Sequence, residues 1–120
     1  MNYEIGEFAA KVGLTIDTLR YYESVGIIAP ARLSNGHRSF NDEDIAWVEF
    51  VKRLKETGMP IKNIKAYSDL RRVGDSTIDE RLELLAEQQN LLKEQQAKTQ
   101  AHLDFLAHKI EYYQELKNNS

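Results

Sequence analysis

The chain has 120 residues, 42% of them hydrophobic, and a net charge of −3 at pH 7. This length fits one compact domain with an extension, and the absence of cysteine excludes disulfides, thiolate metal sites and thiol redox sensing. No stretch is apolar enough to span a bilayer and the N-terminus has no signal-peptide pattern, so the cytoplasm is the expected compartment.

The acidic charge is unevenly distributed along the chain. Residues 1–74 carry 11 Lys and Arg against 10 Asp and Glu, a balance of +1. Residues 75–120 carry 5 against 9, a balance of −4, and the two balances sum to −3. The first part can therefore present a basic face although the whole chain is acidic. Total charge neither supports nor excludes a nucleic-acid partner.

Two short helices are predicted near the N-terminus. Apolar residues recur at helical spacing from Ile5 to Val12, and Gly13 ends that helix. Thr15 is the expected N-cap of a second helix that closes near Gly26. The residues expected to face inward are Leu14, Ile16, Leu19 and Tyr22, and those expected to face outward are Thr18, Arg20 and Tyr21. Two short helices joined by a glycine-containing turn are typical of a helix-turn-helix.

A β-hairpin is predicted after the second helix. Its arms are Arg32-Leu33 and Arg38–Phe40, and Asn35-Gly36 is expected to supply the positive φ angles of a type I′ turn. The outward residues of this wing are expected to be Arg32, His37 and Arg38. A helix for a DNA groove beside a basic loop for the adjacent backbone indicates a winged helix-turn-helix.

Two further helices are predicted before residue 74. Asn41 is the expected cap of the third helix, and Gly58 and Pro60 separate it from the fourth. The aromatic residues of these helices have two interpretations, because they could line a small-molecule pocket or belong to the core, the commoner outcome at helical spacing. These residues are Trp47, Phe50 and Tyr67.

From Ser76 onward the chain contains neither Gly nor Pro and follows an uninterrupted heptad pattern. The heptad residues are Ile78, Leu82, Leu85, Gln89, Leu92, Gln96, Thr99, Leu103, Leu106, Ile110 and Tyr113. Roughly 40 helical residues span about 60 Å at 1.5 Å each. The remaining 74 residues cannot bury so long a stripe, so the helix is expected to pair with a second copy of the chain.

Three polar heptad residues, Gln89, Gln96 and Thr99, interrupt the middle of this stripe. They either mark a weak central segment that is exposed to water or act as polar core positions that set the register of the helix pair. The expected division is a DNA-binding domain over 1–74, a dimerisation helix over 75–117 and a tail over 118–120.

The ordered motifs of residues 1–74 resemble the MerR family of bacterial transcription regulators. The matching elements are Ile5-Gly6-Glu7 with Ala9, Thr18–Glu23, Gly26-Ile27-Ile28-x-Pro30-x-Arg32, Gly36-His37-Arg38-x-Phe40, Asp44-Ile45 and Leu54–Ile61. The long heptad helix is similar to the dimerisation helix of the family. His37 and Phe40 stand where the family often has Tyr.

The resemblance implies a mainly α fold, with a winged helix-turn-helix followed by a long helix that forms an antiparallel coiled coil in a homodimer. It further implies that the two DNA-binding domains of the dimer bind a pseudo-palindromic operator in double-stranded DNA. The resemblance also implies that binding distorts the promoter spacer, so that RNA polymerase can align with the promoter elements. By resemblance Arg20 and Tyr21 contact DNA from the recognition helix and Arg38 grips the backbone. Further candidates for DNA contacts are Thr15, Thr18, Arg32 and His37, the last at the wing tip. Arg32 could instead support the hairpin.

The stretch Leu54–Met59 is similar to a subgroup of the family that responds to reactive aldehydes or nitrosative stress. Sensors in that subgroup use a cysteine around the position of Arg53, and metal-sensing members use paired cysteines. Neither chemistry carries over to a chain without cysteine, and no cofactor is expected. A small-molecule effector would have to bind between the DNA-binding domain and the long helices, because no separate effector domain is expected.

Two other classes of function compete with a DNA-binding regulator. The first is a coiled-coil interaction module that does not read DNA, for which the acidic tail argues. The second is a small enzyme, but no arrangement of nucleophile, base and oxyanion donors can be assembled from the sequence. The effector, the operator, the target genes and the choice between activation and repression are not determined by the sequence.

Overall fold

The computed structural model describes residues 1–119, and Ser120 of the expected tail lies outside the described residues. The fold is mainly α-helical, as predicted, with a small antiparallel sheet. The elements in chain order are β1 (Asn2–Tyr3), α1 (Ile5–Val12), α2 (Ile16–Ser24), β2 (Ala31–Arg32), β3 (Arg38–Asn41), α3 (Asp42–Glu56), α4 (Ile61–Val73), a 3₁₀ turn η1 (Asp75–Thr77) and α5 (Ile78–Asn118). The chain divides into two compact units, Met1–Leu84, here called the head, and the residues from Leu85 onward.

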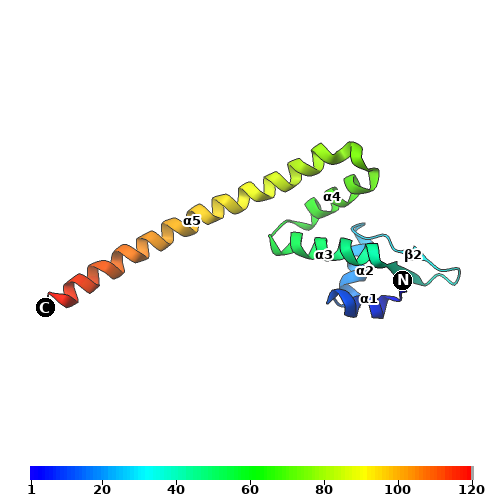
Figure 1. The fold of residues 1–120 in the computed structure, drawn as a ribbon, viewed down its shortest axis with the longest axis horizontal. Helices are drawn as coiled ribbons and strands as arrows, with labels where there is room; N and C mark the ends of the chain where they lie inside the picture. Colours follow the sequence, from blue (N-terminus) through cyan, green and yellow to red (C-terminus); the bar gives the residue numbers. More distant parts are fainter. Residues whose placement is uncertain (120) are drawn as a thin grey trace. The chain divides into compact units, whose positions relative to one another are not determined.

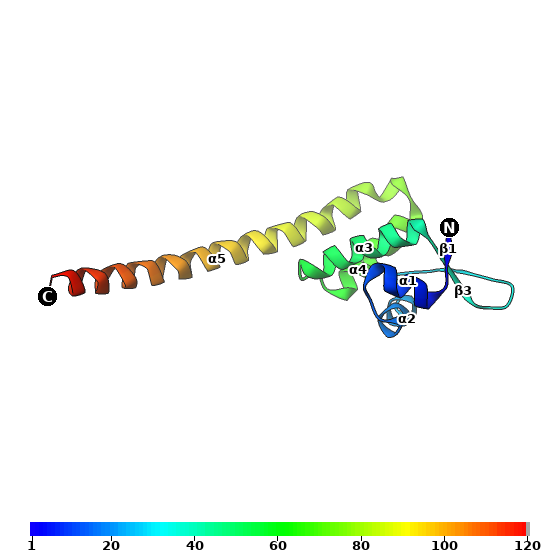
Figure 2. The same ribbon diagram turned by 60° about the horizontal axis from the view of Figure 1, so that its bottom comes forward.

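Helices α1 and α2 form the predicted helix-turn-helix, and α1 packs on both α2 and α3 (Figures 1 and 2). Gly13 follows α1 with φ of 68°, a left-handed conformation that favours glycine, and its N–H donates to the Ala9 carbonyl. Thr15 caps α2, as predicted. The inward orientation predicted for Ile16 is wrong, because its side chain is exposed. Ile16 is the first residue of α2 and precedes the turn that carries Leu19 into the core.

The predicted hairpin is present, but its turn is not type I′. The Gly36 N–H donates to the Leu33 carbonyl at 2.9 Å, and Gly36 alone in the loop has positive φ, at 86°. Asn35 therefore lies at a central position of an ordinary turn, and its side-chain oxygen accepts from the His37 N–H at 3.0 Å. A three-residue loop with glycine in the left-handed position closes the hairpin, so Gly36 supplies the required conformation and Asn35 does not.

The sheet has a third strand that the sequence analysis did not predict. Strand order is β1-β3-β2, all antiparallel, with Tyr3 opposite Phe40 and Arg32 opposite Arg38. The Tyr3 hydroxyl donates to the Asp42 carboxylate at 2.7 Å and so ties β1 to the start of α3. This hydrogen bond raises the pKa of Tyr3 above its ordinary value and lowers the pKa of Asp42 below its own.

The head has a core in which the few buried polar groups are paired. Phe8 and Phe40 stack with ring centroids 4.2 Å apart, and both are fully buried. The Ile27 carbonyl accepts from Trp47 Nε1 and from Ser68 Oγ, each at 2.9 Å. These two bonds attach the segment after α2 to both α3 and α4. They also satisfy the two buried donors, since a buried donor without a partner would be destabilising.

The long helix α5 begins at Ile78, after a hydrogen-bonded corner. Thr77 Oγ1 donates toward the carbonyls of Leu70 and Gly74, and Arg81 donates to Thr77 Oγ1 and to the Gly74 carbonyl. Helix α5 then runs for 41 residues through Asn118 (Figure 1). No helix within residues 1–119 combines the length and the apolar character that crossing a membrane requires.

The apolar heptad residues of α5 are largely exposed in the single chain. Seven of them are 39–58% exposed, namely Ile78, Leu82, Leu92, Leu103, Leu106, Ile110 and Tyr113, and Leu85 is partly buried. An exposed apolar stripe of this length is typical of an interaction surface.

Candidate nucleic-acid interface

The N-terminus of α2 is organised by two threonine side chains. Thr15 Oγ1 accepts from the Thr18 N–H at 3.0 Å, and the two hydroxyls lie 2.8 Å apart in a second hydrogen bond. The cap explains why α2 begins here, because it satisfies a backbone donor at the start of the helix. Both candidate threonines therefore stabilise the N-terminal end of α2.

The outward face of α2 carries Arg20 and Tyr21. The Arg20 side chain is 59% exposed, and its nearest acidic partner is Asp17 at 3.8 Å, a weak surface pair. Tyr21 is 49% exposed, whereas its neighbour Tyr22 is 6% exposed, so the predicted split between surface and core is confirmed for this pair. Burial raises the pKa of Tyr22. Arg20 and Tyr21 are thus presented on a helix that Leu19 and Tyr22 anchor.

The two wing arginines are both held by one carboxylate of α2. Arg38 Nε donates to Glu23 Oε1 at 2.7 Å, and Arg32 Nη2 donates to Glu23 Oε2 at 3.1 Å. Arg32 also donates from Nη1 to the Gly36 carbonyl at 3.2 Å, across the hairpin loop. Charge-assisted bonds of this kind set the orientation of a guanidinium as well as its position. Glu23 therefore connects α2 to the wing.

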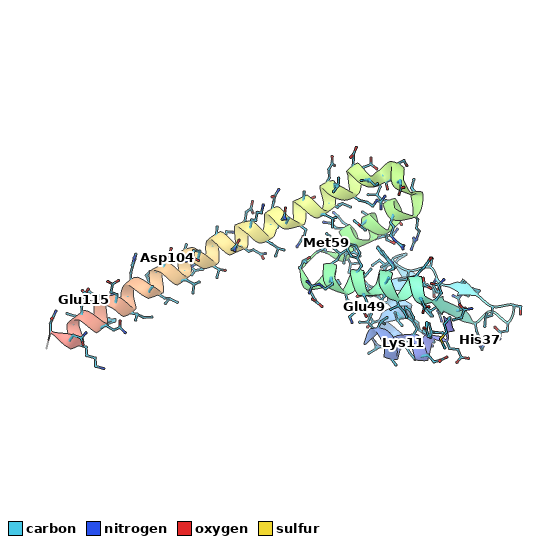
Figure 3. The ribbon with its side chains drawn as sticks, viewed as in Figure 1. Lys11, His37, Glu49, Met59, Asp104 and Glu115 are labelled. Atoms are coloured by element: carbon cyan, nitrogen blue, oxygen red, sulfur yellow. The ribbon has the colours of Figure 1, made fainter. Side chains whose placement is uncertain are left out.

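Four of the seven predicted DNA-binding residues line one concave site, here called the basic hollow. It has a volume of about 320 Å³, and its lining residues are Glu4, Ile5, Arg20, Arg32, Gly36, His37 and Arg38. Arg20 comes from α2, and Arg32 and Arg38 come from β2 and β3, the two arms of the wing. His37 directly follows the loop of this hairpin, which extends from the helices of the head (Figures 2 and 3). Three guanidinium groups around one concavity form a site that suits a phosphate oxygen.

The remaining three predicted residues lie outside the basic hollow. Thr15, Thr18 and Tyr21 lie on α2 and are absent from its lining. This arrangement separates a face of α2 that can enter a groove from a basic concavity beside it that can hold the backbone.

Glu23, which the sequence analysis did not single out as a site residue, pairs with both wing arginines. Glu23 belongs to the motif Thr18–Glu23. In the sequence it is only one acidic residue ahead of two arginines, and acidic residues near basic ones usually form surface pairs. Its side chain is 22% exposed and contacts arginines 9 and 15 residues away. The sequence feature that could have predicted this contact is one acidic residue at the end of the second helix together with two arginines on the predicted hairpin.

Among the residues that the structure describes, no group of three or more His, Cys, Asp and Glu side chains is arranged to hold a metal ion. His102 and His108 are both exposed on α5. The candidate site presents guanidinium, hydroxyl and aromatic groups on a helix and a hairpin.

Comparisons with known families agree with this geometry. Residues 3–70 match the model of the MerR HTH family regulatory proteins, and residues 45–116 match the model described as MerR, DNA binding. An uncharacterized HTH-type transcriptional regulator of Haemophilus influenzae is 37% identical over 98% of this chain and 87% of its own length. The HTH-type transcriptional regulator AdhR of Bacillus subtilis is 41% identical over 75% of this chain and 65% of its own length.

Two solved structures are also similar over most of the chain. One is the crystal structure of HiNmlR, a MerR family regulator lacking the sensor domain, bound to promoter DNA, at 37% identity and a TM-score of 0.77, covering 98% of this chain and 94% of that one. Another is a putative MerR family regulator from Listeria monocytogenes, at 37% identity and a TM-score of 0.80, covering 92% and 85%. The likeness to the aldehyde- and nitrosative-stress subgroup is confirmed by the matches to HiNmlR and AdhR. The chain belongs to the MerR family of HTH regulatory proteins and is a DNA-binding transcription regulator, not an enzyme.

Proposed function

We propose that this regulator is a homodimer that binds a specific pseudo-palindromic operator through Arg20, Tyr21 and the basic hollow of each head. The observation that carries the proposal is the convergence of Arg20, Arg32 and Arg38 on one concavity beside the exposed face of α2. Thr15, Thr18 and His37 contribute further contacts at the ends of α2 and of the wing.

The dimer is proposed from the exposed heptad residues of α5. Helices of about 60 Å that pair in antiparallel fashion would cover the apolar stripe and would hold two heads at a constant separation. A constant separation permits recognition of two half-sites, since operator symmetry mirrors protein symmetry. The solved relative HiNmlR is bound to promoter DNA, and this supports a promoter as the target.

We further propose that binding distorts the promoter spacer for RNA polymerase, with the protein acting in the cytoplasm, where its DNA would lie. Bending a site of this kind costs about 1–6 kcal/mol, which phosphate contacts from both heads would offset. In this account the wing holds the backbone of the distorted duplex, and α2 reads the bases.

Fluorescence anisotropy with a duplex from the promoter beside its own gene tests the function. We expect binding that weakens steeply as salt rises, because phosphate contacts release counterions. Arg20→Ala and Arg38→Ala should each weaken binding by about tenfold or more while the protein remains dimeric. The matched control is Arg53→Ala, since Arg53 is an exposed arginine on α3 whose only described ion pair is with Glu56.

Unchanged affinity in both Arg20→Ala and Arg38→Ala would reject the assigned contacts. Selection from a random duplex library addresses specificity separately. If no sequence is enriched, the alternative of a coiled-coil interaction module replaces the operator-binding proposal.

A further inference from the structure

A second concavity lies in the head, on helices that do not contribute to the basic hollow. It has a volume of about 400 Å³ and lies between α3, α4 and the first turns of α5. This concavity is here called the aromatic hollow. Its principal lining residues are Glu43, Trp47, Phe50, Tyr67, Arg71 and Arg81. The volume is within the range of roughly 300–1,000 Å³ that small-molecule sites occupy.

Three aromatic rings form the apolar wall of the aromatic hollow. The ring centroids of Trp47 and Phe50 lie 5.8 Å apart, those of Phe50 and Tyr67 5.4 Å apart, and those of Trp47 and Tyr67 6.1 Å apart with nearly parallel planes. Trp47 is buried, while Phe50 and Tyr67 are partly exposed toward the hollow. The core interpretation is confirmed for Trp47, which is buried, and the three rings also line a concavity.

Two arginines give this wall a positive charge. The Arg71 guanidinium carbon lies 4.3 Å from the centroid of the Trp47 ring. Arg81 donates from Nε to Thr77 Oγ1 at 3.1 Å and from Nη2 to the Gly74 carbonyl at 3.0 Å. Those bonds orient its guanidinium and leave its Nη1 donors for a ligand.

Neither arginine forms an ion pair within residues 1–119, although most arginines of the head do. Glu43 is the single acidic residue of the lining, so the site carries an excess of one positive charge. An excess positive charge next to apolar rings favours an anion that also has a flat apolar part.

We infer that the aromatic hollow binds a small planar aromatic anion, with an aromatic carboxylate as the chemical class. The rings of Phe50, Tyr67 and Trp47 contact the aromatic part, and Arg71 and Arg81 donate to the carboxylate. Glu43 on the rim disfavours a second negative charge and accepts from a hydroxyl or amino substituent. This site is separate from the basic hollow, with which it shares no lining residue.

The single tryptophan of the chain provides a direct measurement of binding. Trp47 Nε1–H is held by the Ile27 carbonyl at 2.9 Å and yields one indole signal in a ¹H–¹⁵N spectrum of the full chain. Titration with 2-naphthoate is expected to shift this signal saturably. The uncharged analogue 2-naphthylmethanol, the non-aromatic cyclohexanecarboxylate and inorganic phosphate are expected to bind at least about tenfold more weakly, because each lacks one of the two recognised features.

Two neighbouring arginines provide matched variants. Arg71→Gln should weaken 2-naphthoate binding by about tenfold, whereas Arg72→Gln should change it by less than about twofold, since Arg72 pairs with Asp69 outside the hollow. Tyr67→Leu removes a ring without removing charge and should also weaken binding. DNA binding of the same samples reports separately on the proposed function.

Three results would overturn the inference. The first is the absence of a saturable shift of the Trp47 signal, which is the result expected if a second copy of the chain covers the aromatic hollow. The second is equal affinity for 2-naphthoate and 2-naphthylmethanol. The third is an equal effect of Arg71→Gln and Arg72→Gln on 2-naphthoate binding. If Arg20→Ala loses DNA binding but still binds 2-naphthoate, the result supports a ligand site that is separate from the DNA contacts.

Discussion

Replacing Glu23 by glutamine tests whether this carboxylate positions the wing. Glu23 is 22% exposed and accepts charge-assisted bonds from Arg38 at 2.7 Å and from Arg32 at 3.1 Å. Glutamine keeps the shape and one acceptor oxygen but removes the charge, and its amide group would face guanidinium donors. The wing should therefore remain folded, while both arginines lose the negative charge that they share and one of them also loses its acceptor.

The expected loss of stability follows from those contacts. Hydrogen bonds to charged groups contribute about 1.5–3 kcal/mol each, and partial exposure to water reduces this value. We expect Glu23→Gln to lower the free energy of unfolding by about 1–2 kcal/mol. The control Glu56→Gln removes the same charge from an exposed pair with Arg53 and should cost at most about 0.5 kcal/mol.

The expected effect on DNA binding has two opposing parts. Ordering a released side chain costs about 0.5–1.5 kcal/mol, so two arginines cost about 1–3 kcal/mol when the operator complex forms. Removal of a negative charge near phosphate strengthens binding to every duplex equally. The ratio of operator affinity to scrambled-duplex affinity should therefore fall by about tenfold.

Urea unfolding at one protein concentration and anisotropy with both duplexes measure these two quantities. An affinity ratio within about twofold of the parent protein would refute a positioning role for Glu23, as would a stability equal to that of Glu56→Gln. If operator binding improves and the ratio rises, the carboxylate acts only as a repulsive charge.

Three further predictions concern the sheet, the wing and the long helix. The pKa of Asp42 is lowered in the fold, so its bond to Tyr3 stabilises the fold above the ordinary pKa of 3.8, and this effect is lost as the pH falls through the lower folded pKa. Between pH 5 and strongly acidic pH, the free energy of unfolding of Tyr3→Phe, measured with urea, should consequently fall less than that of the parent protein. Parallel curves of unfolding free energy against pH would contradict this linkage. Gly36→Ala should destabilise the head by about 1 kcal/mol, because φ of 86° is strained for alanine even though the space around it is open, and an unchanged thermal midpoint would count against the observed loop conformation. Leu103→Asp should yield a monomer at tens of micromolar in sedimentation, whereas Ala101→Asp, two residues away and outside the heptad stripe, should remain a dimer; identical behaviour of the two variants would argue against the heptad seam.

Local patterns were sufficient to predict the helices and their caps. Gly13, Thr15 and Asn41 act within three or four residues of their own positions, so their roles can be predicted without knowledge of the fold. The heptad period likewise predicts a helix through Tyr113. These signals depend on neighbours along the chain.

Short or strained features were not predictable in the same way. Strand β1 has two residues, too few for a period, and exists because Tyr3 and Asn2 pair with β3 some 37 residues later. The turn type was wrong because Asn35-Gly36 fits two loop lengths, and only the pairing of Arg32 with Arg38 selects the three-residue loop. Ile16 was misplaced because helical spacing does not show where a helix leaves the core.

Local patterns in the sequence predicted the helix-turn-helix, the hairpin and the long heptad helix. The ordered motifs of residues 1–74 resembled the MerR family, and the comparisons with known families confirmed that membership. Three arrangements became visible in the folded chain alone: Glu23 holds Arg32 and Arg38, three arginines share the basic hollow, and Trp47, Phe50 and Tyr67 line the aromatic hollow. These arrangements join residues from separate elements, and their distances depend on how buried side chains such as Phe8, Phe40 and Ile27 pack those elements together.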